Sequence, residues 1–300
     1  MALGYASPAG RAVFFVVSLP SQGSESMQKL QLPRLVFATL LALGLFAGVA
    51  QAQYRVPDTT STTVGEKYRF EVSFNFWNPT PATIVNSEAL GILGTDINLV
   101  DDLGIEKQTM KDLRIVLRPA KKHRFRINYV PLTYEAEGQV RREFVFNGQR
   151  YRVGLPVSTT AQFTTWRFGY EYDFLYRDRG FLGAIVDVKY TDSNVELNSP
   201  IGAEFAKQVA PIPTIGAVGR VYATKNLALN GEVSYFKMPE NAWEDHQGRY
   251  VDFDVNATFN PHKNFGVQVG YRSIDVFYAA RKDTGTLTFK GLYFGGTARF

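Results

Sequence analysis

The chain has 300 residues, a formal net charge of +5 at pH 7 and no cysteine. The lack of cysteine excludes disulfides, thiolate metal sites, cysteine nucleophiles and a lipid-anchored lipoprotein. The small excess of basic residues is too dispersed along the chain to indicate a nucleic-acid partner. Aromatic residues make up 14% of the sequence. That share is high for a soluble domain and is typical of a protein with aromatic girdles at two membrane interfaces.

The N-terminal region carries the pattern of a cleavable export signal. Two basic residues, Lys29 and Arg34, follow Met27. An apolar stretch over residues 35–49 comes next, and Ala-Gln-Ala follows it at 50–52. A positive region, a short apolar region and an Ala-x-Ala site together indicate a secretory signal peptide. The apolar stretch is too short for a membrane anchor, because a spanning helix needs about 20 residues.

These features divide the chain into four parts. We expect residues 27–52 to be the signal peptide. Residues 1–26 are interpreted as a non-native extension, because a start codon placed too early explains a second apolar patch in front of the signal. Residues 53–66 are expected to form a polar periplasmic tether. The rest, 67–300, has a length that one all-β domain often occupies.

From residue 67 onward, apolar and polar side chains alternate in segment after segment. The clearest segment is 160–176, where six aromatic residues face one side and charged or small residues face the other. In a soluble sandwich, such charged faces would leave little material for a second layer. In a membrane barrel, the aromatic face meets lipid and the charged face meets the lumen. The expected strands are 67–77, 110–118, 123–134, 160–176, 181–191, 211–223, 227–238, 250–260, 265–278 and 286–300.

Short and long connections alternate between these strands. Short turns at 119–122, 177–180, 224–226 and 261–264 lie between longer loops at 78–109, 135–159, 192–210, 239–248 and 279–285. This asymmetry is typical of outer-membrane barrels, which have short periplasmic turns and longer outer loops. It predicts an all-β, antiparallel, up-and-down transmembrane barrel of ten strands.

A twelve-stranded barrel is the alternative, in which residues 139–146 and 150–157 also cross the bilayer. We prefer ten strands because the second of these segments is charged and short, whereas a spanning strand needs about 9–11 residues. On this interpretation the pair is a hairpin above the membrane, which turns at Asn147-Gly148.

If the apolar faces look outward, nearly balanced opposite charges line the lumen. Ion pairs between them are expected to fill the interior, because small barrels are largely filled by side chains. A polar plug is therefore favoured, and a narrow, selective solute channel is the alternative. The predicted lumen charge network is Arg69, Glu71, Asp112, Arg114, Arg126, Arg167, Glu171, Asp173, Asp187, Arg220, Glu232, Asp252, Asp254 and Arg272.

Little in the sequence indicates catalysis. The chain has three histidines, and only His246 falls in an expected outer loop, beside three acidic residues and Trp243. Such a group is more often a solvated loop than an active site. An outer-rim lipid-modifying enzyme is therefore only a further alternative. The motifs of serine hydrolases, zinc proteases and phosphate-binding loops do not occur. We expect no catalytic residue and no cofactor.

An acidic stretch in the first expected outer loop, residues 94–104, offers oxygen ligands that suit calcium. Its spacing does not match the twelve-residue calcium loop. A loop strand with a solvated face is the better interpretation, so no metal site is predicted. The oxygen-bearing residues are Asp96, Asn98, Asp101 and Asp102.

The export signal, the alternation and the terminal Phe300 resemble those of Gram-negative outer-membrane β-barrels over essentially the whole mature chain. Residues 96–104, 118–126 and 144–148 more narrowly resemble a group of uncharacterised small single-chain barrels with no assigned reaction. The resemblance implies an outer-membrane location, outer-membrane lipids as neighbours and a monomer. It also implies barrel assembly machinery and periplasmic chaperones as partners during biogenesis, with Phe300 as the assembly signal. The expected role is structural or a surface interaction.

Overall fold

The computed structural model describes residues 13–14, 63–88, 93–239, 246–280 and 283–300. The expected signal peptide, 27–52, lies outside these ranges, as does most of the expected tether. The expected extension, 1–26, is described only at β1 (Val13–Phe14), which pairs in parallel with β11. Within the described ranges, no helix is long and apolar enough to cross a membrane.

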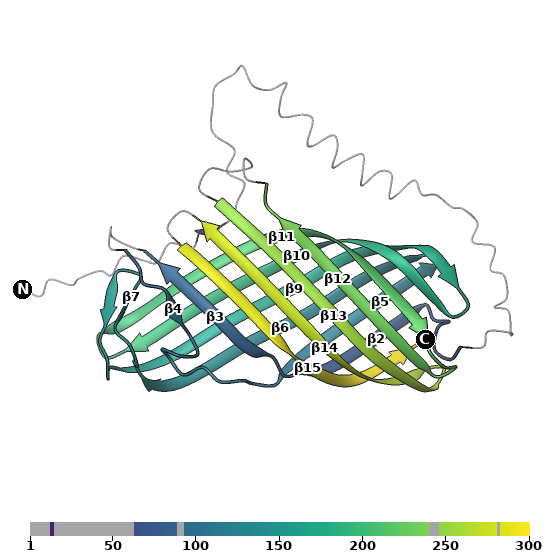
Figure 1. Cartoon of the computed structure of the whole chain (residues 1–300), viewed down its shortest axis with the longest axis horizontal. Helices are drawn as coiled ribbons and strands as arrows, with labels where there is room; N and C mark the ends of the chain where they lie inside the picture. Colours follow the sequence, from purple (N-terminus) through teal and green to yellow (C-terminus); the bar gives the residue numbers. More distant parts are fainter. Residues whose placement is uncertain (1–12, 15–62, 89–92, 240–245, 281–282) are drawn as a thin grey trace, which may run out of the picture. The chain divides into compact units, whose positions relative to one another are not determined.

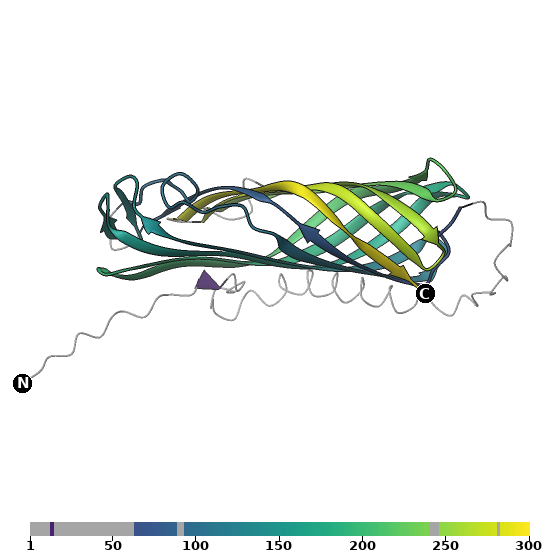
Figure 2. The same cartoon turned by 90° about the horizontal axis from the view of Figure 1, so that it is seen from below.

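Ten long strands form a closed antiparallel ring (Figures 1 and 2). Each strand pairs with the next along the chain, and the last pairs with the first, which closes the barrel. This confirms the ten-stranded prediction. The strands are β2 (Phe70–Trp77), β5 (Met110–Ala120), β6 (His123–Gln139), β9 (Pro156–Arg177), β10 (Gly180–Ser199), β11 (Gly202–Tyr222), β12 (Leu227–Lys237), β13 (His246–His262), β14 (Phe265–Ala280) and β15 (Asp283–Arg299).

The first expected outer loop, 78–109, contains a strand that the sequence pattern did not predict. β3 (Thr80–Ser87) continues in the direction of β2 and pairs with the first half of β15, whereas β2 pairs with the second half. The break between them falls at Asn78-Pro79, and a proline cannot donate a ladder hydrogen bond. The short β4 (Ile97–Asn98) pairs with β3.

The structure also corrects the expected outer loop 192–210, because residues 180–199 of β10 pair with residues 202–221 of β11 without interruption. The reason is a reversal of polarity along each strand. Val186 and Val188 face outward, whereas farther along β10 Val195 and Leu197 are buried inside the barrel. Beyond the membrane, the outer face of the strand meets water and the inner face forms an apolar core. The pattern of outward apolar residues therefore ends, although the strand itself continues.

The hairpin at Asn147-Gly148 is present as predicted. β7 (Phe144–Phe146) and β8 (Gln149–Tyr151) form a separate two-stranded sheet at the outer end, which is not part of the barrel wall. Asn147 has φ 49° and Gly148 has φ 80°. Positive φ at both central residues is the geometry of the tight hairpin turns that match strand twist. The twelve-stranded alternative is therefore wrong.

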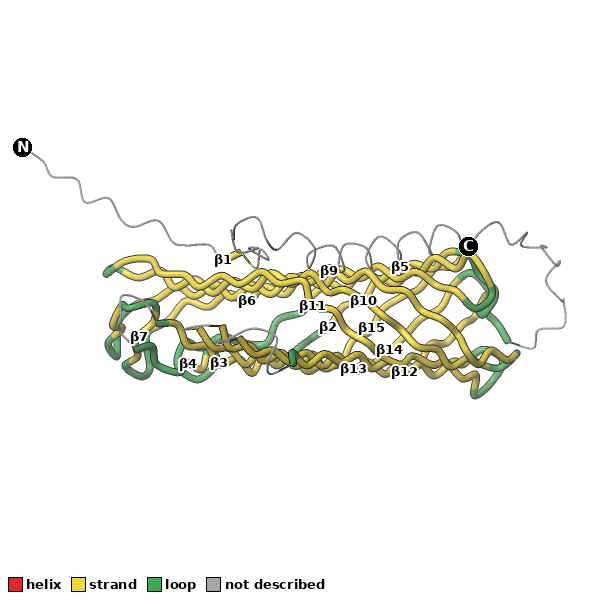
Figure 3. Tube along the Cα trace, turned by 90° about the horizontal axis from the view of Figure 1, so that it is seen from above, coloured by secondary structure: helices red, strands yellow, loops and turns green. Residues whose placement is uncertain are grey.

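Strands make up the wall of the barrel (Figure 3). An apolar belt surrounds the half of this wall nearer the short turns. Its side chains are large, point away from the lumen and are 36% to 66% exposed, as expected of surfaces that meet lipid. Members of the belt include Phe74, Phe76, Leu117, Phe125, Trp166, Phe168, Tyr170, Phe174, Val186, Tyr190, Ile215, Val221, Leu229, Tyr235, Phe253, Phe259, Val267, Tyr271, Leu292 and Phe294.

Candidate functional site

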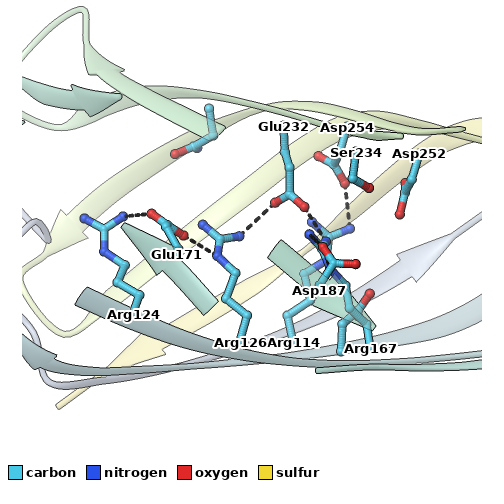
Figure 4. Close-up of polar contacts among 12 residues, drawn as sticks. Arg114, Arg124, Arg126, Arg167, Glu171, Asp187, Glu232, Ser234, Asp252 and Asp254 are labelled. Atoms are coloured by element: carbon cyan, nitrogen blue, oxygen red, sulfur yellow. Dashed lines mark hydrogen bonds and ion pairs between the residues drawn. The ribbon is translucent and has the colours of Figure 1, made fainter. Parts of the chain in front are cut away.

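A chain of alternating charges crosses the lumen at the level of the apolar belt (Figure 4). Arg124 on β6 contacts Glu171 on β9, with Nη1 and Oε1 2.7 Å apart. Glu171 also accepts a hydrogen bond from Arg126. The Arg126 Nη1 atom then lies 2.8 Å from Oε2 of Glu232 on β12, on a different wall of the barrel.

The same chain continues from Glu232 to the next wall. The other carboxylate oxygen of Glu232 pairs with Arg167 on β9. Arg167 Nη2 is 2.6 Å from Asp187 Oδ2 on β10, and Asp187 also accepts a hydrogen bond from Thr214 on β11. Side chains from five strands are thus joined through alternating charges.

A second cluster links β5, β10, β13 and β14. Arg114 lies between two carboxylates, with its Nη2 atom 2.6 Å from Asp112 and 2.7 Å from Asp254. Arg272 donates to Asp252 from Nε and from Nη2, at 3.1 and 2.9 Å. Lys189 completes the cluster, because its Nζ atom is 3.0 Å from Asp252 Oδ2.

At the end of the barrel that carries the short turns, the interior is occupied by Glu66, a residue that the sequence analysis placed in the tether. Glu66 is only 2% exposed. Its carboxylate lies 3.5 Å from Arg118 and Arg124 and 3.3 Å from Arg220, and it accepts a hydrogen bond from Tyr222 at 3.3 Å. The polar character of 53–66 suggested a solvated tether, so only the excess of lumen arginines hinted at an extra acidic partner.

Of the predicted lumen residues, thirteen lie inside the barrel and one does not. Arg69 is exposed, which corrects the prediction for that residue. β2 begins only at Phe70, and the backbone N–H groups of Arg69 and Phe70 both donate to the Phe300 carbonyl. The chain before β2 turns into the barrel mouth, so Tyr68 takes the interior position and the simple alternation fails there.

Arg299 and Lys189 belong to the network but were missed by the prediction. Arg299 is 2% exposed and pairs with Glu71. Both residues hold lumen-facing positions in their strands, so the alternation of side chains was the signal that could have identified them. Phe300 itself is 69% exposed at the short-turn end, where its ring lies 6.4 Å from that of Phe70.

Little free space remains in the charged half of the lumen. One cavity there has a volume of about 90 Å³ and is lined by charged and polar side chains that include Arg114, Arg126, Arg220 and Gln268. A buried water needs a cavity of at least roughly 10–15 Å³, so this cavity has room for a few waters at most. It is a small polar pocket within the network rather than a wide pore.

The outer half of the lumen is apolar. Residues 93–109 and the β7–β8 hairpin fold inward and pack against the strands, where Leu99, Ile105 and Phe146 are each at most 2% exposed. The inserted segment is hydrogen-bonded to the wall, for example from Leu99 N to Thr83 O. Its partners from the wall include Val130, Leu132, Tyr134, Val157, Phe163, Val195, Leu197, Ile274, Val276, Leu287 and Phe289.

The oxygen-bearing side chains of the acidic stretch 94–104 form hydrogen bonds and an ion pair with protein groups. They do not converge on one point as metal ligands would. Asn98 donates from its backbone to Asp102 and from its side chain to Asp101. Asp102 also forms an ion pair with Arg142, and the hydrogen bonds from Arg142 lower the pKa of the Asp102 carboxyl. In the described part of the chain, no three acidic or histidine residues form a group that could hold a metal ion.

Of the three histidines, one lies at the outer end of the barrel and two lie at the short-turn end. His246 begins β13 at the outer end, and its three acidic neighbours in the sequence, Glu240, Glu244 and Asp245, lie outside the described residues. His123 and His262 border the short turns. His123 Nδ1 is hydrogen-bonded to Tyr170 Oη at 2.6 Å, and His262 Nδ1 accepts a hydrogen bond from the backbone of Asn264 at 3.3 Å.

Comparison with known proteins identifies the fold. No protein-family model matches the sequence, and no curated protein matches it significantly. Among solved structures, the outer-membrane protease OmpT from Escherichia coli has a TM-score of 0.52 at 10% identity, over 77% of this chain and 96% of that one. Ail, the attachment invasion locus protein of Yersinia pestis, has a TM-score of 0.36 at 9% identity, over 77% of this chain and 99% of that one.

OmpT shares the fold with this chain, and at that identity the likeness extends to nothing else. The closed ring of ten strands, the outward apolar belt and the charged lumen agree with that fold. The chain is an integral β-barrel of the bacterial outer membrane.

Proposed function

We propose that the protein is a non-conducting barrel that anchors a rigid structure at the cell surface. The observation that carries the proposal is the ion pair between Arg126 and Glu232, which joins opposite walls within the membrane segment. Two further closures support it. Glu66 fills the short-turn end, and the apolar core around Leu99 and Phe146 fills the outer end.

The part that projects beyond the belt supports a surface role. Outside the belt, the strands turn apolar side chains such as Leu197 and Phe289 inward and polar ones outward. A rim with a packed core keeps a fixed shape, because its side chains cannot rearrange without losing contacts. Such a rim is suited to contacts with other molecules, which we propose as its role in place of transport or catalysis.

Single-channel conductance in planar bilayers tests the proposal. We expect the refolded protein to give no discrete steps over a range of salts and voltages. A variant that removes the cross-lumen links, Arg126→Ala with Glu232→Ala, should give small steps and shows that insertion succeeded. Discrete steps from the unaltered protein, changed in size by Arg167→Ala, would overturn the proposal in favour of a narrow channel.

A further inference from the structure

β11 extends much farther outward than one of its two neighbours. Its pairing with β10 covers residues 202–221, whereas its pairing with β12 covers only residues 215–222. On the side away from β10, residues 202–214 therefore face no other strand of the barrel ring in the described part of the chain. We call this side of residues 202–214 the open edge. It lies beyond the apolar belt, which ends on β11 at Ile215.

The backbone groups on the open edge can be identified from the ladder on the other side. The N–H of Tyr222 donates to the carbonyl of Arg179, just before β10, so the even-numbered residues of β11 point their backbone groups toward β10. Successive residues of a strand point these groups to opposite sides, and the pairing with β10 has no register shift. The odd-numbered residues therefore present their N–H and carbonyl groups to the open edge.

Two prolines limit the open edge toward the membrane. Pro211 and Pro213 are odd-numbered, so the N–H that each lacks would face the open edge. Both nevertheless hold their places in the pairing with β10, opposite Tyr190 and Val188. Proline within a sheet is confined to edges for this reason. The part of the open edge that can donate hydrogen bonds is thus residues 203–209.

This part of the edge lacks the usual protection against added strands. A lysine on an edge normally keeps other chains away. Lys207 lies on the open edge, but its Nζ atom is 3.1 Å from Oδ2 of Asp192, which belongs to β10 on the other side. The ring of Phe205 is 42% exposed although it lies beyond the belt. An aromatic side chain on a strand is stabilised by an apolar neighbour on the next strand.

The structure already contains a short strand on the open edge. Val13 and Phe14 of β1 pair in parallel with Gln208 and Val209. Both residues precede the expected signal peptide, so the mature protein is expected to lack them. The pairing therefore indicates which kind of segment suits the edge, namely an extended and apolar one.

A second copy of this chain does not suit the edge. Strands of outer-membrane barrels are tilted by about 35–45° from the barrel axis. Two identical barrels side by side in one membrane face each other with opposite tilts, so their β11 strands would cross at about 70–90°. A ladder of hydrogen bonds needs nearly aligned strands. A flexible segment of another protein can align with β11 freely.

We propose that the open edge of β11, at residues 203–209, binds an extended, apolar segment of another protein as an added strand. Main-chain hydrogen bonds supply the affinity in such strand addition, and alternate side chains supply the selectivity. The odd-numbered residues 203, 205, 207 and 209 provide the hydrogen bonds, and Phe205 selects an apolar side chain beside it. The inference rests on the surface role proposed above, for which it specifies the kind of partner.

Proline substitution tests the proposal, because it removes donors from the open edge and leaves the ladder with β10 intact. The variant is Lys207→Pro with Val209→Pro. The matched control is Lys207→Ala with Val209→Ala, which changes the same side chains and keeps both N–H groups. Each protein is expressed from the full sequence, isolated from outer membranes and placed in lipid nanodiscs. Far-UV circular dichroism and the melting temperature confirm that each is folded.

The probe is a fluorescent peptide with the sequence of residues 10–21, and its binding is measured by anisotropy. The control peptide carries Phe14→Pro and Phe15→Pro, which removes a donor from whichever side of the peptide faces β11. We expect the unaltered protein and the alanine control to bind the probe equally. The proline variant should bind it on the order of 30-fold more weakly, because two backbone hydrogen bonds are lost. The control peptide should bind no better than to empty nanodiscs.

Several outcomes would overturn the proposal. They are no binding by the unaltered protein, equal binding by the proline variant and equal binding of the control peptide. Residues 13–14 in the mass of the isolated protein would also overturn it, because the chain itself would then cover the edge.

A disulfide measurement gives a second test that needs no proline. Because the chain has no cysteine, Val209→Cys gives a single thiol on the open edge. A peptide with Phe14→Cys places its thiol opposite, in the register of β1, at the short separation that a disulfide requires. The control is Asn198→Cys on β10, where strands lie on both sides. We expect a disulfide with Val209→Cys only, and equal cross-linking at both positions would contradict the proposal.

Failure of this inference can be told apart from failure of the proposed function. Discrete conductance steps from the unaltered protein would overturn the non-conducting barrel and would leave the peptide results unchanged. Loss of peptide binding would remove the added strand and would leave a silent barrel as it is.

Discussion

Arg126 and Glu232 face each other across the interior of the barrel, with Nη1 of the arginine 2.8 Å from Oε2 of the glutamate. One residue lies on β6 and the other on β12. The contact therefore works as a strut between opposite walls, in addition to the hydrogen bonds between neighbouring strands.

Removing this strut should destabilise the barrel strongly. Glu232→Ala leaves the half-buried Arg126 and the buried Arg167 without a shared carboxylate. Breaking one side of a buried ion pair costs about 3–5 kcal/mol, so we expect a loss of that size in the free energy of unfolding, measured by urea titration in detergent. The matched control is Glu143→Ala, which breaks the exposed pair with Arg150 and should cost less than about 1 kcal/mol. Equal losses would show that the cross-lumen contact adds nothing.

The short-turn end should open when Glu66 loses its charge. Glu66→Gln weakens the contacts with Arg118, Arg124 and Arg220 that hold the preceding segment in the mouth. Because the chain has no cysteine, Thr63→Cys gives a single thiol at a position that is only 8% exposed. We expect thiol reagents to label it slowly alone and several-fold faster in combination with Glu66→Gln.

A cysteine at the exposed Lys67 serves as the control for that experiment. It should react rapidly with or without the Glu66 substitution, because it does not depend on the segment being released. If Thr63→Cys reacts as rapidly as this control in the presence of Glu66, the mouth is not closed by the segment.

Docking of the acidic stretch 94–104 should depend on pH through Asp102. The pKa of Asp102 in the folded protein is lowered because Arg142 donates hydrogen bonds to the ionised form. A lowered folded pKa contributes stability that is fully present above the unfolded value of about 3.9 and is lost as pH falls through the folded value. Limited proteolysis should therefore find the stretch protected at pH 7 and progressively cleaved in strongly acidic buffer. Arg142→Gln should move the onset of cleavage to higher pH, and an unchanged onset would contradict this account.

The apolar core of the outer half should be sensitive to truncation. Phe289 is 3% exposed, and its ring lies 5.9 Å from that of Tyr134 and 5.2 Å from that of Phe163. Phe289→Ala leaves a cavity among these rings and should lower the free energy of unfolding by about 3–5 kcal/mol. Val153→Ala, at a position that is 66% exposed, should change it by less than about 0.5 kcal/mol. A small loss for Phe289→Ala would show that the outer half is not a close-packed core.

The membrane segment of the barrel follows from alternation alone, because lipid on one side and a polar lumen on the other force every second residue to one face. That is why Arg167, Glu171 and Asp187 could be placed inside from the sequence. The same argument failed at Arg69, where the chain leaves the regular strand and the period of two no longer applies.

The outer half was not predictable in the same way. Once β10 leaves the membrane, its inward residues become apolar, as at Val195 and Leu197, and its outer ones polar. A prediction based on lipid-facing residues therefore assigns the outer part of such a strand to a loop. β3 was hidden for another reason, because Pro79 interrupts the pattern and the pairing partner lies about 200 residues later on β15. Glu66 escaped detection because its partners come from three distant strands.

The closing strand β15 is divided between two partners, since β2 pairs with residues 293–299 and β3 with residues 283–290. The barrel is thus closed by two separate strand pairings, and Asn78-Pro79 lies between them. The pairing of β2 with β15 closes the barrel within the bilayer. The pairing of β3 with β15 closes the part that projects into water. The two ladders share no hydrogen bond, so separation of β3 from β15 in the outer part breaks none of the bonds that close the barrel between β2 and β15.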